Sequence, residues 1–346
     1  MPHELVADWP GHAVLQQYSE PILEAEQIRV RSLFSSVKHG TELRVFSGQS
    51  EDSTQPFDPE LRLHRREDGA KSSIQFPLSL GNMCFGVVTE MGPAVSRFKV
   101  GDHVFAHLHT RETHTVHQDS VRLAPPHISP QTLMYWDPAT FALGGIRDGN
   151  VRLGDRVAVF GLGAIGQMAV QMARIAGACR VVAIDPIEAR RQAALKHGAD
   201  LVLDPKAVDV GVTLKMEAGK MGVDVAMETS GSPHAFYDAL RSIRYQGTLV
   251  STAYYVGALQ GLYFAGEWHR NRPKLISSRA CSDPQLDFGW DYERIETEAL
   301  ALLTDGRLNA EDLIDPIVPF ERAATAYQEI NEHPERSIKL GIDHTL

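Results

Sequence analysis

The arrangement of hydrophobic and polar positions differs between the first and the later parts of the chain. Up to residue 140, apolar residues form short runs broken by glycine and proline, as in Gln27–Leu33 and Gly86–Met91. Short runs bounded by turn residues are typical of β-strands. They predict an irregular, mostly β domain, in which the polar, turn-rich stretch 49–73 is a surface excursion between strands.

From about residue 155 onward, apolar strands alternate with amphipathic segments. Arg156–Phe160 and Arg180–Ile184 are short apolar runs of the kind found in buried strands. Between them, apolar side chains recur at helical spacing from Ile165 to Ala176, and Gly177 ends the segment. The later predicted elements are a helix at 187–197 and strands at 223–227 and 247–251, with a helical segment between the strands. This alternation indicates βαβ units around a parallel sheet.

Composition narrows the class of protein. At 346 residues the chain exceeds the length at which a single core usually stops growing, which favours two domains. The formal charge of -10 disfavours binding to nucleic acid or to anionic membranes. No signal peptide or membrane-spanning run is predicted, and the three cysteines lack the spacing of a disulfide framework. We therefore expect a cytoplasmic protein whose partner is a small molecule.

A glycine-rich motif lies directly after a predicted strand and at the start of a predicted helix. It consists of Gly161, Leu162, Gly163, Ala164, Ile165 and Gly166. The three glycines of G-x-G-x-x-G permit a tight turn, close approach to a pyrophosphate and close packing of helix on strand. The helix N-terminus adds free N–H groups and the positive end of its dipole. The motif predicts a dinucleotide site.

Asp185 ends the next predicted strand, where the dinucleotide fingerprint requires an acidic residue. A carboxylate at this point accepts hydrogen bonds from the ribose hydroxyls of NAD and repels the 2′-phosphate of NADP. The predicted cofactor is therefore NAD. An alternative role for Asp185 is to cap the helix that follows Pro186. Arg190, on that helix, lies either near the adenosine ribose or at the surface.

The order of motifs resembles that of the medium-chain dehydrogenase/reductase superfamily, which contains the zinc alcohol and polyol dehydrogenases. The matching segments are His39–Glu42, Gly81–Met83, Gly86–Gly92, Phe98–Val104, Asp137–Pro138 and Gly161–Gly166. The tail 257–279 is similar to the branch that contains bacteriochlorophyllide hydroxyethyl dehydrogenases, which implies oxidation of a secondary alcohol.

The resemblance also implies the architecture. It implies an α/β protein in which a Rossmann doubly wound parallel sheet, residues 141–279, is inserted into a mostly β GroES-like catalytic domain. The catalytic domain would consist of residues 1–140 and 280–346. The resemblance further implies a homodimer formed through the cofactor domains.

The positions that hold catalytic zinc in the superfamily carry His39, Asn82, Met83 and Asp137 in this chain. A catalytic zinc usually needs three protein ligands from cysteine, histidine and carboxylate. Only His39 and Asp137 qualify, and the cysteine-rich loop of the structural zinc is missing as well. We predict a site without metal. The alternative is an unusual site completed by one of His107, His109 and His114.

Without a metal, a protein group must exchange the proton of the substrate hydroxyl. His39 suits this role because its unperturbed pKa is about 6.5. Asp137 would orient the imidazole, and Thr41 matches the superfamily's hydroxyl that hydrogen-bonds the substrate oxygen. Lys38 is a competing base, although neighbours in an extended strand face opposite sides. The structural alternatives are a packed or hydrogen-bonded histidine for His39, a turn hydroxyl for Thr41 and a cap before Pro138 for Asp137.

Further residues complete the hypothesis. Trp136, Tyr254, Tyr255 and His269 are predicted to line the substrate pocket, with the core as the alternative. Lys339 resembles the basic residue that reaches the cofactor pyrophosphate, with a surface lysine as the alternative, and Glu42 is expected to be structural. Two other functions stay open: an NADPH-dependent quinone or enoyl reductase, against which Asp185 argues, and a catalytically silent NAD-binding sensor.

Overall fold

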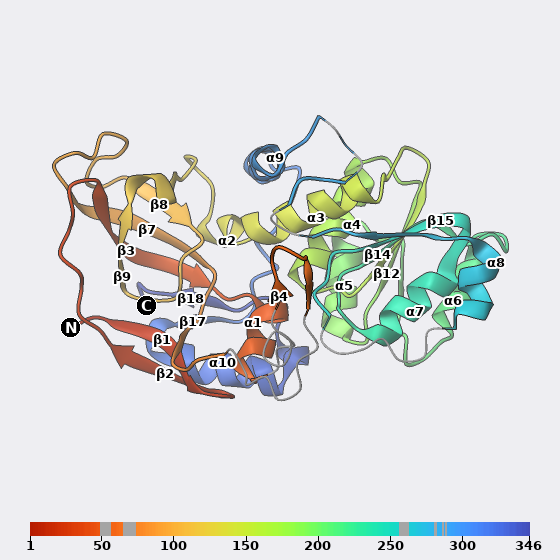
Figure 1. Ribbon diagram of the computed structural model, residues 1–346, viewed down its shortest axis with the longest axis horizontal. Helices are drawn as coiled ribbons and strands as arrows, with labels where there is room; N and C mark the ends of the chain where they lie inside the picture. Colours follow the sequence, from red (N-terminus) through yellow and green to blue (C-terminus); the bar gives the residue numbers. More distant parts are fainter. Residues whose placement is uncertain (49–56, 65–73, 256–262, 280–281, 286, 288) are drawn as a thin grey trace. The chain divides into compact units, whose positions relative to one another are not determined.

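The computed structural model describes residues 1–48, 57–64, 74–255, 263–279, 282–285, 287 and 289–346 (Figure 1). Contacts divide the chain into two compact units. The first unit consists of Met1–Met134 and Ile314–Leu346, and the second is Tyr135–Leu313. The second unit therefore interrupts the first.

The boundaries differ from those expected at 140 and 279. The second unit begins at Tyr135, because α3 (Trp136–Asp148) belongs to it as a whole. It extends to Leu313, because α9 (Tyr292–Thr304) packs against α3. The sequence analysis predicted no helix at α3 or α9, so the expected boundaries rested on the superfamily resemblance alone.

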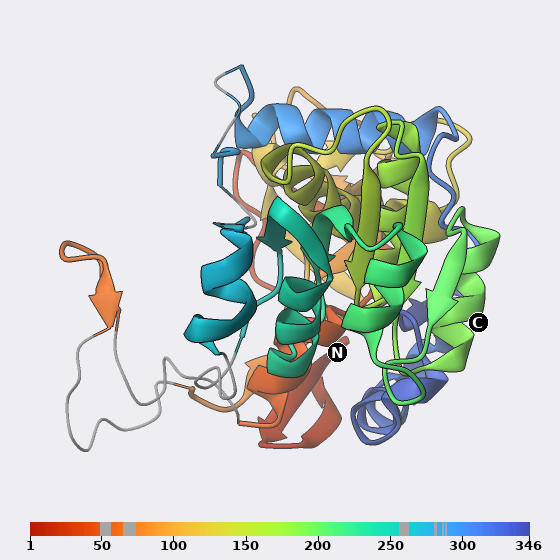
Figure 2. The same cartoon turned by 90° about the vertical axis from the view of Figure 1, so that its right-hand side faces the viewer.

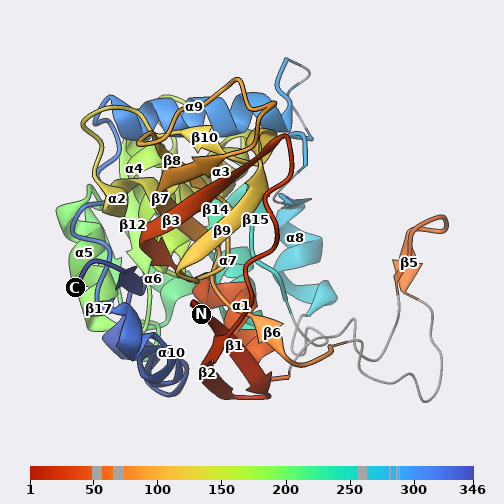
Figure 3. The same ribbon diagram turned by 90° about the vertical axis from the view of Figure 1, so that its left-hand side faces the viewer.

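The first unit is mostly β, as predicted (Figure 3). The strands of its larger sheet are β3 (Gln27–Ser36), β7 (Met83–Met91), β8 (His103–Ala106), β9 (Thr113–His117), β10 (Arg122–Leu123), β17 (Ile317–Pro319) and β18 (Gly341–Asp343). Their order is β10-β8-β7-β3-β18-β17, and β9 also pairs with β3. Strand β18 lies antiparallel to β3, which places Gly341 opposite Ser36. The end of the chain thus lies beside the segment that leads into His39.

A smaller sheet and several helices also belong to the first unit. The sheet has the order β2-β1-β6, formed by β1 (His3–Trp9), β2 (His12–Gln17) and β6 (Leu78–Ser79). The helices are α1 (His39–Phe46), α2 (Pro130–Leu133) and α10 (Ala323–Glu332). Phe46 of α1 and Tyr327 of α10 meet edge to face, with ring centroids 4.9 Å apart, in a core that also contains Leu5 and Leu340. This core fixes α1 at its buried C-terminal end.

The second unit contains a parallel sheet, which confirms the predicted fold class (Figure 2). Its strands are β11 (Arg156–Phe160), β12 (Arg180–Ile184), β13 (Leu201–Leu203), β14 (Val223–Glu228), β15 (Ile243–Ser251) and β16 (Lys274–Ser277). Their order is β13-β12-β11-β14-β15-β16. The sequence pattern had placed β11, β12 and the end of β15 at the observed residues.

The connecting helices lie on both faces of this sheet. They are α4 (Ala164–Ile175), α5 (Glu188–Lys196), α6 (Val210–Glu217), α7 (Pro233–Ser242) and the short α8 (His269–Asn271). From β11, helices α4 and α5 connect to β12 and then β13, on one side of β11 in the sheet. Helix α6 then leads back to β14, on the other side of β11, and α7 connects β14 to β15. Right-handed crossovers in opposite directions place the two pairs on opposite faces, and α3 packs beside α4 (Figure 1).

The carboxyl ends of the central strands form one row. Phe160 pairs with both Ile184 and Glu228, and Glu228 pairs with Ser251. The chain segments that follow these residues therefore emerge at one edge of the sheet. In open α/β sheets this edge, beside the point where strand order reverses, is where ligands bind.

Two sequence predictions fall partly outside the described residues. Of the stretch 49–73, the structure describes 57–64, which form a short hairpin of β4 (Phe57–Asp58) and β5 (Leu63–His64). Of the tail 257–279, residues 257–262 are outside the described part. Short 3-10 or π turns occupy Gln118–Ser120, Phe264–Trp268, Phe320–Arg322 and Pro334–Arg336. Within the described part of the chain, no helix combines the length and the apolar character needed to span a bilayer.

Candidate functional site

The glycine-rich turn joins β11 to α4, the context that the motif requires. Gly161 has a φ of +84°, which favours glycine, and a Cβ there would lie 2.6 Å from the Cβ of Ser230. A Cβ on Gly166 would lie 1.9 Å from the carbonyl oxygen of Gly161, so α4 starts in direct contact with the turn. At Gly163, by contrast, a Cβ would have no heavy atom within 4 Å beyond its chain neighbours. That open side leaves room for a phosphate.

The first N–H groups of α4 are available to a ligand at this turn. Gly163 is the N-cap and has no side chain to bond the amides of the first helical turn, where Ala164 and Ile165 lie. The N–H of Leu162 is used differently, because it donates to Oδ2 of Asp185 at 2.7 Å. The geometry meets the physical requirements of a pyrophosphate site.

Asp185 is a structural brace as well as a candidate ribose ligand. Its Oδ1 accepts the N–H of Ile187 at 2.8 Å, and the residue is almost fully buried. The carboxylate thus joins the end of β12 to the glycine turn and to Ile187. Asp185 is not the helix cap that the alternative predicted, because Ile187 is the N-cap of α5. Each carboxylate oxygen can accept a further hydrogen bond, so the ribose role stays a prediction.

The arginines after β12 are partnered with acidic groups. Arg191 donates to the carbonyl of Asp185 at 2.7 Å and forms ion pairs with Glu188 and Asp204. Arg190 is only partly exposed: burial lowers the pKa of its guanidinium, and the charge of Asp185 opposes this shift. Positive charge at this end of the sheet is therefore largely balanced by carboxylates.

One residue of this edge had not been singled out from the sequence. Glu228 ends β14 and is fully buried, and burial raises the pKa of its carboxyl group. Tyr255, predicted to line the substrate pocket, donates its hydroxyl to Glu228 and packs edge to face against Phe236. The only signal in the sequence was an acidic residue closing an apolar strand.

The other residues predicted for the substrate pocket differ in their surroundings. Trp136 is buried and donates its indole N–H to the carbonyl of Glu296 at 3.0 Å, which favours the core alternative. Tyr254 is 46% exposed, and His269 is exposed at the start of α8. Asp137 is buried in the first turn of α3. All of these residues belong to the second unit.

In the first unit, the expected extended segment around His39 is instead the start of α1. The argument that neighbours face opposite sides therefore does not apply to Lys38 and His39. The Nε2 atom of His39 accepts the N–H of Leu340 at 2.9 Å. A neutral ring in this arrangement carries its proton on Nδ1. Thr41, in the first turn of the helix, is exposed.

Glu42 joins three segments of the first unit through hydrogen bonds. Its Oε2 accepts the N–H of Lys38 at 3.0 Å, and its Oε1 accepts the N–H of Gly81 at 2.7 Å and the hydroxyl of Tyr327 at 2.8 Å. One carboxylate thus holds the start of α1, the Gly81 turn and α10 together.

Lys339 is buried, which rules out the surface alternative. The residue is 2% exposed, and Nζ donates to the carbonyl of Val37 at 2.8 Å. Together with the bond from Leu340 to His39, this contact clamps the end of the chain onto the approach to α1. Contact of Lys339 with a pyrophosphate stays a prediction.

Of the four residues at the former zinc positions, only His39 and Asp137 are of a type that zinc prefers. His39 uses Nε2 for a backbone N–H, Met83 is completely buried in the core, and Asn82 offers only an amide. Of the alternative ligands, His114 is buried with its pKa lowered to about 3 by desolvation, and the charge of Arg111 lowers it further. Across the described residues, no three histidine, cysteine or acidic side chains are grouped to hold a metal ion.

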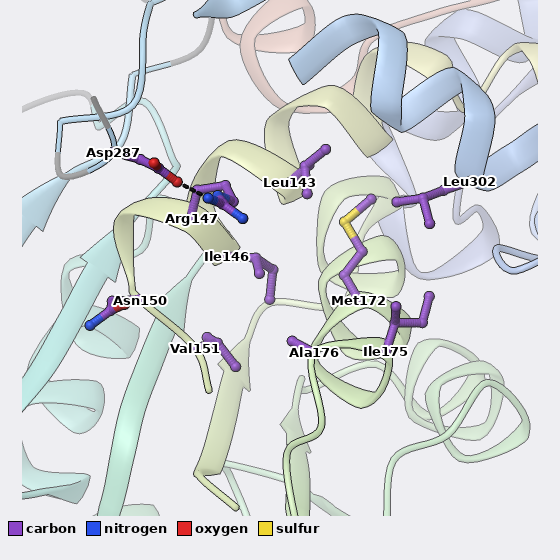
Figure 4. Close-up of a pocket in the computed structure, with 10 residues that line it drawn as sticks. All are labelled: Leu143, Ile146, Arg147, Asn150, Val151, Met172, Ile175, Ala176, Asp287 and Leu302. Carbon is purple, nitrogen blue, oxygen red and sulfur yellow. Dashed lines mark ion pairs between the residues drawn. The ribbon is translucent and has the colours of Figure 1, made fainter. Parts of the chain in front are cut away.

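The second unit also contains a hollow beside α3 and α4 (Figure 4). It has a volume of about 350 Å³ and is lined mainly by apolar residues of α3 and α4, with an ion pair between Arg147 and Asp287 on one side. Met172 and Ile175, which line it, are in the last turn of α4, whereas the glycine turn is at the opposite end of this helix. The glycine turn, and not this hollow, stays the predicted dinucleotide site.

Comparisons with known proteins agree with this architecture. Residues 53–180 match a family described as alcohol dehydrogenase GroES-like domain, and residues 164–295 match zinc-binding dehydrogenase. D-guloside 3-dehydrogenase of Escherichia coli strain K12 is 40% identical to this chain over 346 residues, covering 98% of this chain and 99% of that protein. Sorbitol dehydrogenase of Bacillus subtilis is 25% identical over 300 residues, covering 77% of this chain and 81% of that protein.

A solved structure shares the fold. A protein from Sinorhizobium meliloti 1021, described as a zinc-binding dehydrogenase and bound to NADP, superposes with a TM-score of 0.78 at 18% identity, covering 99% of both chains.

Two glycine substitutions should separate ligand binding from packing. Gly163→Ala should weaken NADH binding by about tenfold or more, because its methyl group occupies the side from which a pyrophosphate approaches. Its melting temperature should stay close to that of the wild type, since the φ of -69° suits alanine. Gly166→Ala should instead lower the free energy of unfolding by about 1 to 3 kcal/mol through overpacking against Gly161. Titration calorimetry and thermal denaturation measure the two effects, and unchanged NADH affinity in Gly163→Ala would contradict the site.

Acid should destabilise the first unit through its buried histidines. The pKa is about 3 for His114 and about 4 for His344, both lowered chiefly by burial from 6.5. Between these values and pH 6.5 the unfolded chain binds more protons than the folded chain. The contribution of the two histidines to the free energy of unfolding is therefore fully present above pH 6.5 and is lost as the pH falls. For His114 the loss between pH 6.5 and 5 should approach about 2 kcal/mol. In urea unfolding, the free energy of unfolding should fall less with decreasing pH in His114→Gln than in the partly exposed control His333→Gln. Parallel pH profiles of the two variants would exclude this contribution.

Proposed function

Because this chain belongs to the medium-chain alcohol and polyol dehydrogenases, a superfamily of oxidoreductases with a GroES-like and a Rossmann-type domain, we propose that it oxidises a secondary hydroxyl group of a cyclic sugar derivative with NAD. The main support is the glycine-rich turn followed by Asp185, in a chain similar over its full length to a D-guloside 3-dehydrogenase. The proposed substrates are glycosides and related polyols. This substrate class is inferred from the name of the D-guloside 3-dehydrogenase to which the chain is similar.

In the proposed reaction, the carbinol C–H bond breaks and its hydride passes to C4 of the nicotinamide ring. The O–H proton leaves to a protein base, and the products are a ketone, NADH and a proton. The chain's own part is to hold the dinucleotide at the turn between β11 and α4 and to take the proton. Positioning of the two reactants accounts for much of the rate in such a transfer.

The choice of NAD is supported by the charges after β12. The carboxylates of Asp185 and Glu188 are placed there, and the nearby Arg191 is already engaged by Glu188 and Asp204. A 2′-phosphate would therefore meet negative charge, and Arg191 would have to leave its carboxylate partners to bind it. The NADP bound to the Sinorhizobium meliloti protein makes the phosphorylated cofactor the competing possibility.

The proton path is proposed to run without zinc. Thr41 would receive the substrate's hydroxyl proton and pass it to His39. Asp137, which belongs to the second unit, keeps the supporting role that the superfamily resemblance implies. His39 can accept a proton at Nε2 only by releasing the N–H of Leu340. Loss of one such hydrogen bond costs about 1 kcal/mol.

Cofactor preference tests the role of Asp185. NADH should bind about tenfold more tightly than NADPH, a difference of about 1.4 kcal/mol. Asp185→Ser should weaken both cofactors, because the brace to Leu162 and Ile187 is lost, but it should bring the ratio of the two dissociation constants closer to one. Calorimetry with both nucleotides measures the ratio. Equal affinities in the wild type would favour the NADPH-dependent reductase.

Activity on a panel of methyl glycosides and polyols tests the function and the proton path. The wild type should reduce NAD with at least one secondary alcohol of the panel after chelator treatment, and elemental analysis should show far less than one zinc per chain. His39→Ala should lower turnover by about 10² to 10⁴-fold, with NADH affinity unchanged.

His39→Gln is the matched control for this experiment. Its side-chain oxygen can accept the N–H of Leu340 but cannot take a proton at neutral pH. If turnover in His39→Gln equals that of the wild type, His39 is a structural residue. Stoichiometric zinc lost together with activity would exclude the metal-free path, and NADH binding without turnover on any alcohol would favour the silent sensor.

A further inference from the structure

A buried carboxylate lies directly behind the glycine turn. Glu228 is the last residue of β14 and is fully buried. Strand β14 runs parallel to β11, and Glu228 pairs in register with Phe160, the residue that precedes Gly161. Burial of a charged carboxylate costs free energy unless several hydrogen-bond donors compensate for the lost water.

Four donors converge on this carboxylate. The N–H groups of Ser230 and Gly231 donate at 2.8 and 3.1 Å, and the hydroxyls of Ser230 and Tyr255 donate as well. Tyr255 in turn accepts the hydroxyl proton of Ser251 at 3.0 Å, at the end of the neighbouring strand. The carboxylate therefore folds residues 229–231 back over the end of β14 and ties them to β15.

The segment held in this way is the one that touches the glycine turn. The hydroxyl of Thr229 donates to the carbonyl of Gly161 at 2.8 Å, and its N–H donates to the carbonyl of Phe160 at 2.9 Å. Ser230 lies so close to Gly161 that a Cβ on the glycine would be 2.6 Å from the Cβ of the serine. The carbonyl of Gly161 is also the group against which Gly166 packs.

We propose that Glu228 is a positioning residue for dinucleotide binding. It holds Thr229, Ser230 and Gly231 against Gly161, so that the turn keeps the shape that a pyrophosphate needs, although Glu228 itself touches no ligand. The inference rests on the proposed function only in taking a nicotinamide dinucleotide as the ligand of the turn.

The substitution Glu228→Gln tests this role in the full-length protein. A glutamine keeps the size of the side chain but replaces one acceptor oxygen with an NH₂ group that faces donors. The dissociation constants of NADH and ADP-ribose should rise by about tenfold or more, whereas that of adenosine, which has no phosphate, should change less than about twofold. In turnover, KM for NAD should rise while KM for the alcohol stays the same.

Two further variants keep the test decisive. Glu217→Gln, an exposed acid of the same unit that is paired with Arg180, should leave all three affinities unchanged. Tyr255→Phe removes one donor of four and should weaken NADH by a few-fold at most, so it reports on the same contact if Glu228→Gln does not fold.

The outcomes separate this inference from the proposed function. If the wild type does not bind NADH, the proposed function fails. If the wild type binds NADH and Glu228→Gln binds it equally well, only the positioning role is wrong. An equal loss for NADH, ADP-ribose and adenosine would mean general destabilisation of the unit, and would also overturn the positioning role.

Discussion

The contact of α4 with its own turn is the constraint on which the second unit depends. Gly166 lies so close to the carbonyl of Gly161 that any side chain would separate the helix from the end of β11. This contact points the start of α4 at the edge where the central strands end, and it leaves the space around Gly163 open. The order of the strands then brings Asp185 and Glu228 to the same edge. A ligand with two phosphates fits the resulting combination of open backbone and helix N-terminus.

Three acidic residues show how this protein uses carboxylates to hold distant backbone segments together. Glu42, Asp185 and Glu228 each accept at least two backbone N–H groups from segments that leave regular structure. An ionised acceptor makes a stronger hydrogen bond than a neutral one, and turns near a ligand need such support. The presence of a carboxylate at these positions does not show by itself whether the residue binds a ligand. A carboxylate that holds the backbone and one that binds a ligand both act as hydrogen-bond acceptors. Only a measurement that separates affinity from folding distinguishes the two roles.

The first unit combines a superfamily framework with an unusual set of side chains. The end of the chain is clamped onto the approach to α1, through Lys339 to Val37 and through Leu340 to His39. The second of these contacts engages His39, at a position where the superfamily resemblance implies a metal ligand. Of the four residues at such positions, only the engaged imidazole of His39 and the carboxylate of Asp137 are groups that zinc prefers. The proposed proton path is the simplest chemistry that the remaining groups allow, and its weak point is the bond to Leu340.

The sequence by itself determined several elements of the second unit. Periodicity located β11, β12 and α4 to within a residue or so, because apolar spacing directly reflects which face is buried. The glycine motif determined the turn, because only glycine tolerates such close approach. Tertiary structure alone decided what the polar side chains bond to: Tyr255 binds Glu228 and His39 accepts from Leu340. These partners are far apart in sequence, and no local pattern encodes a contact that the packing of separate strands and helices creates.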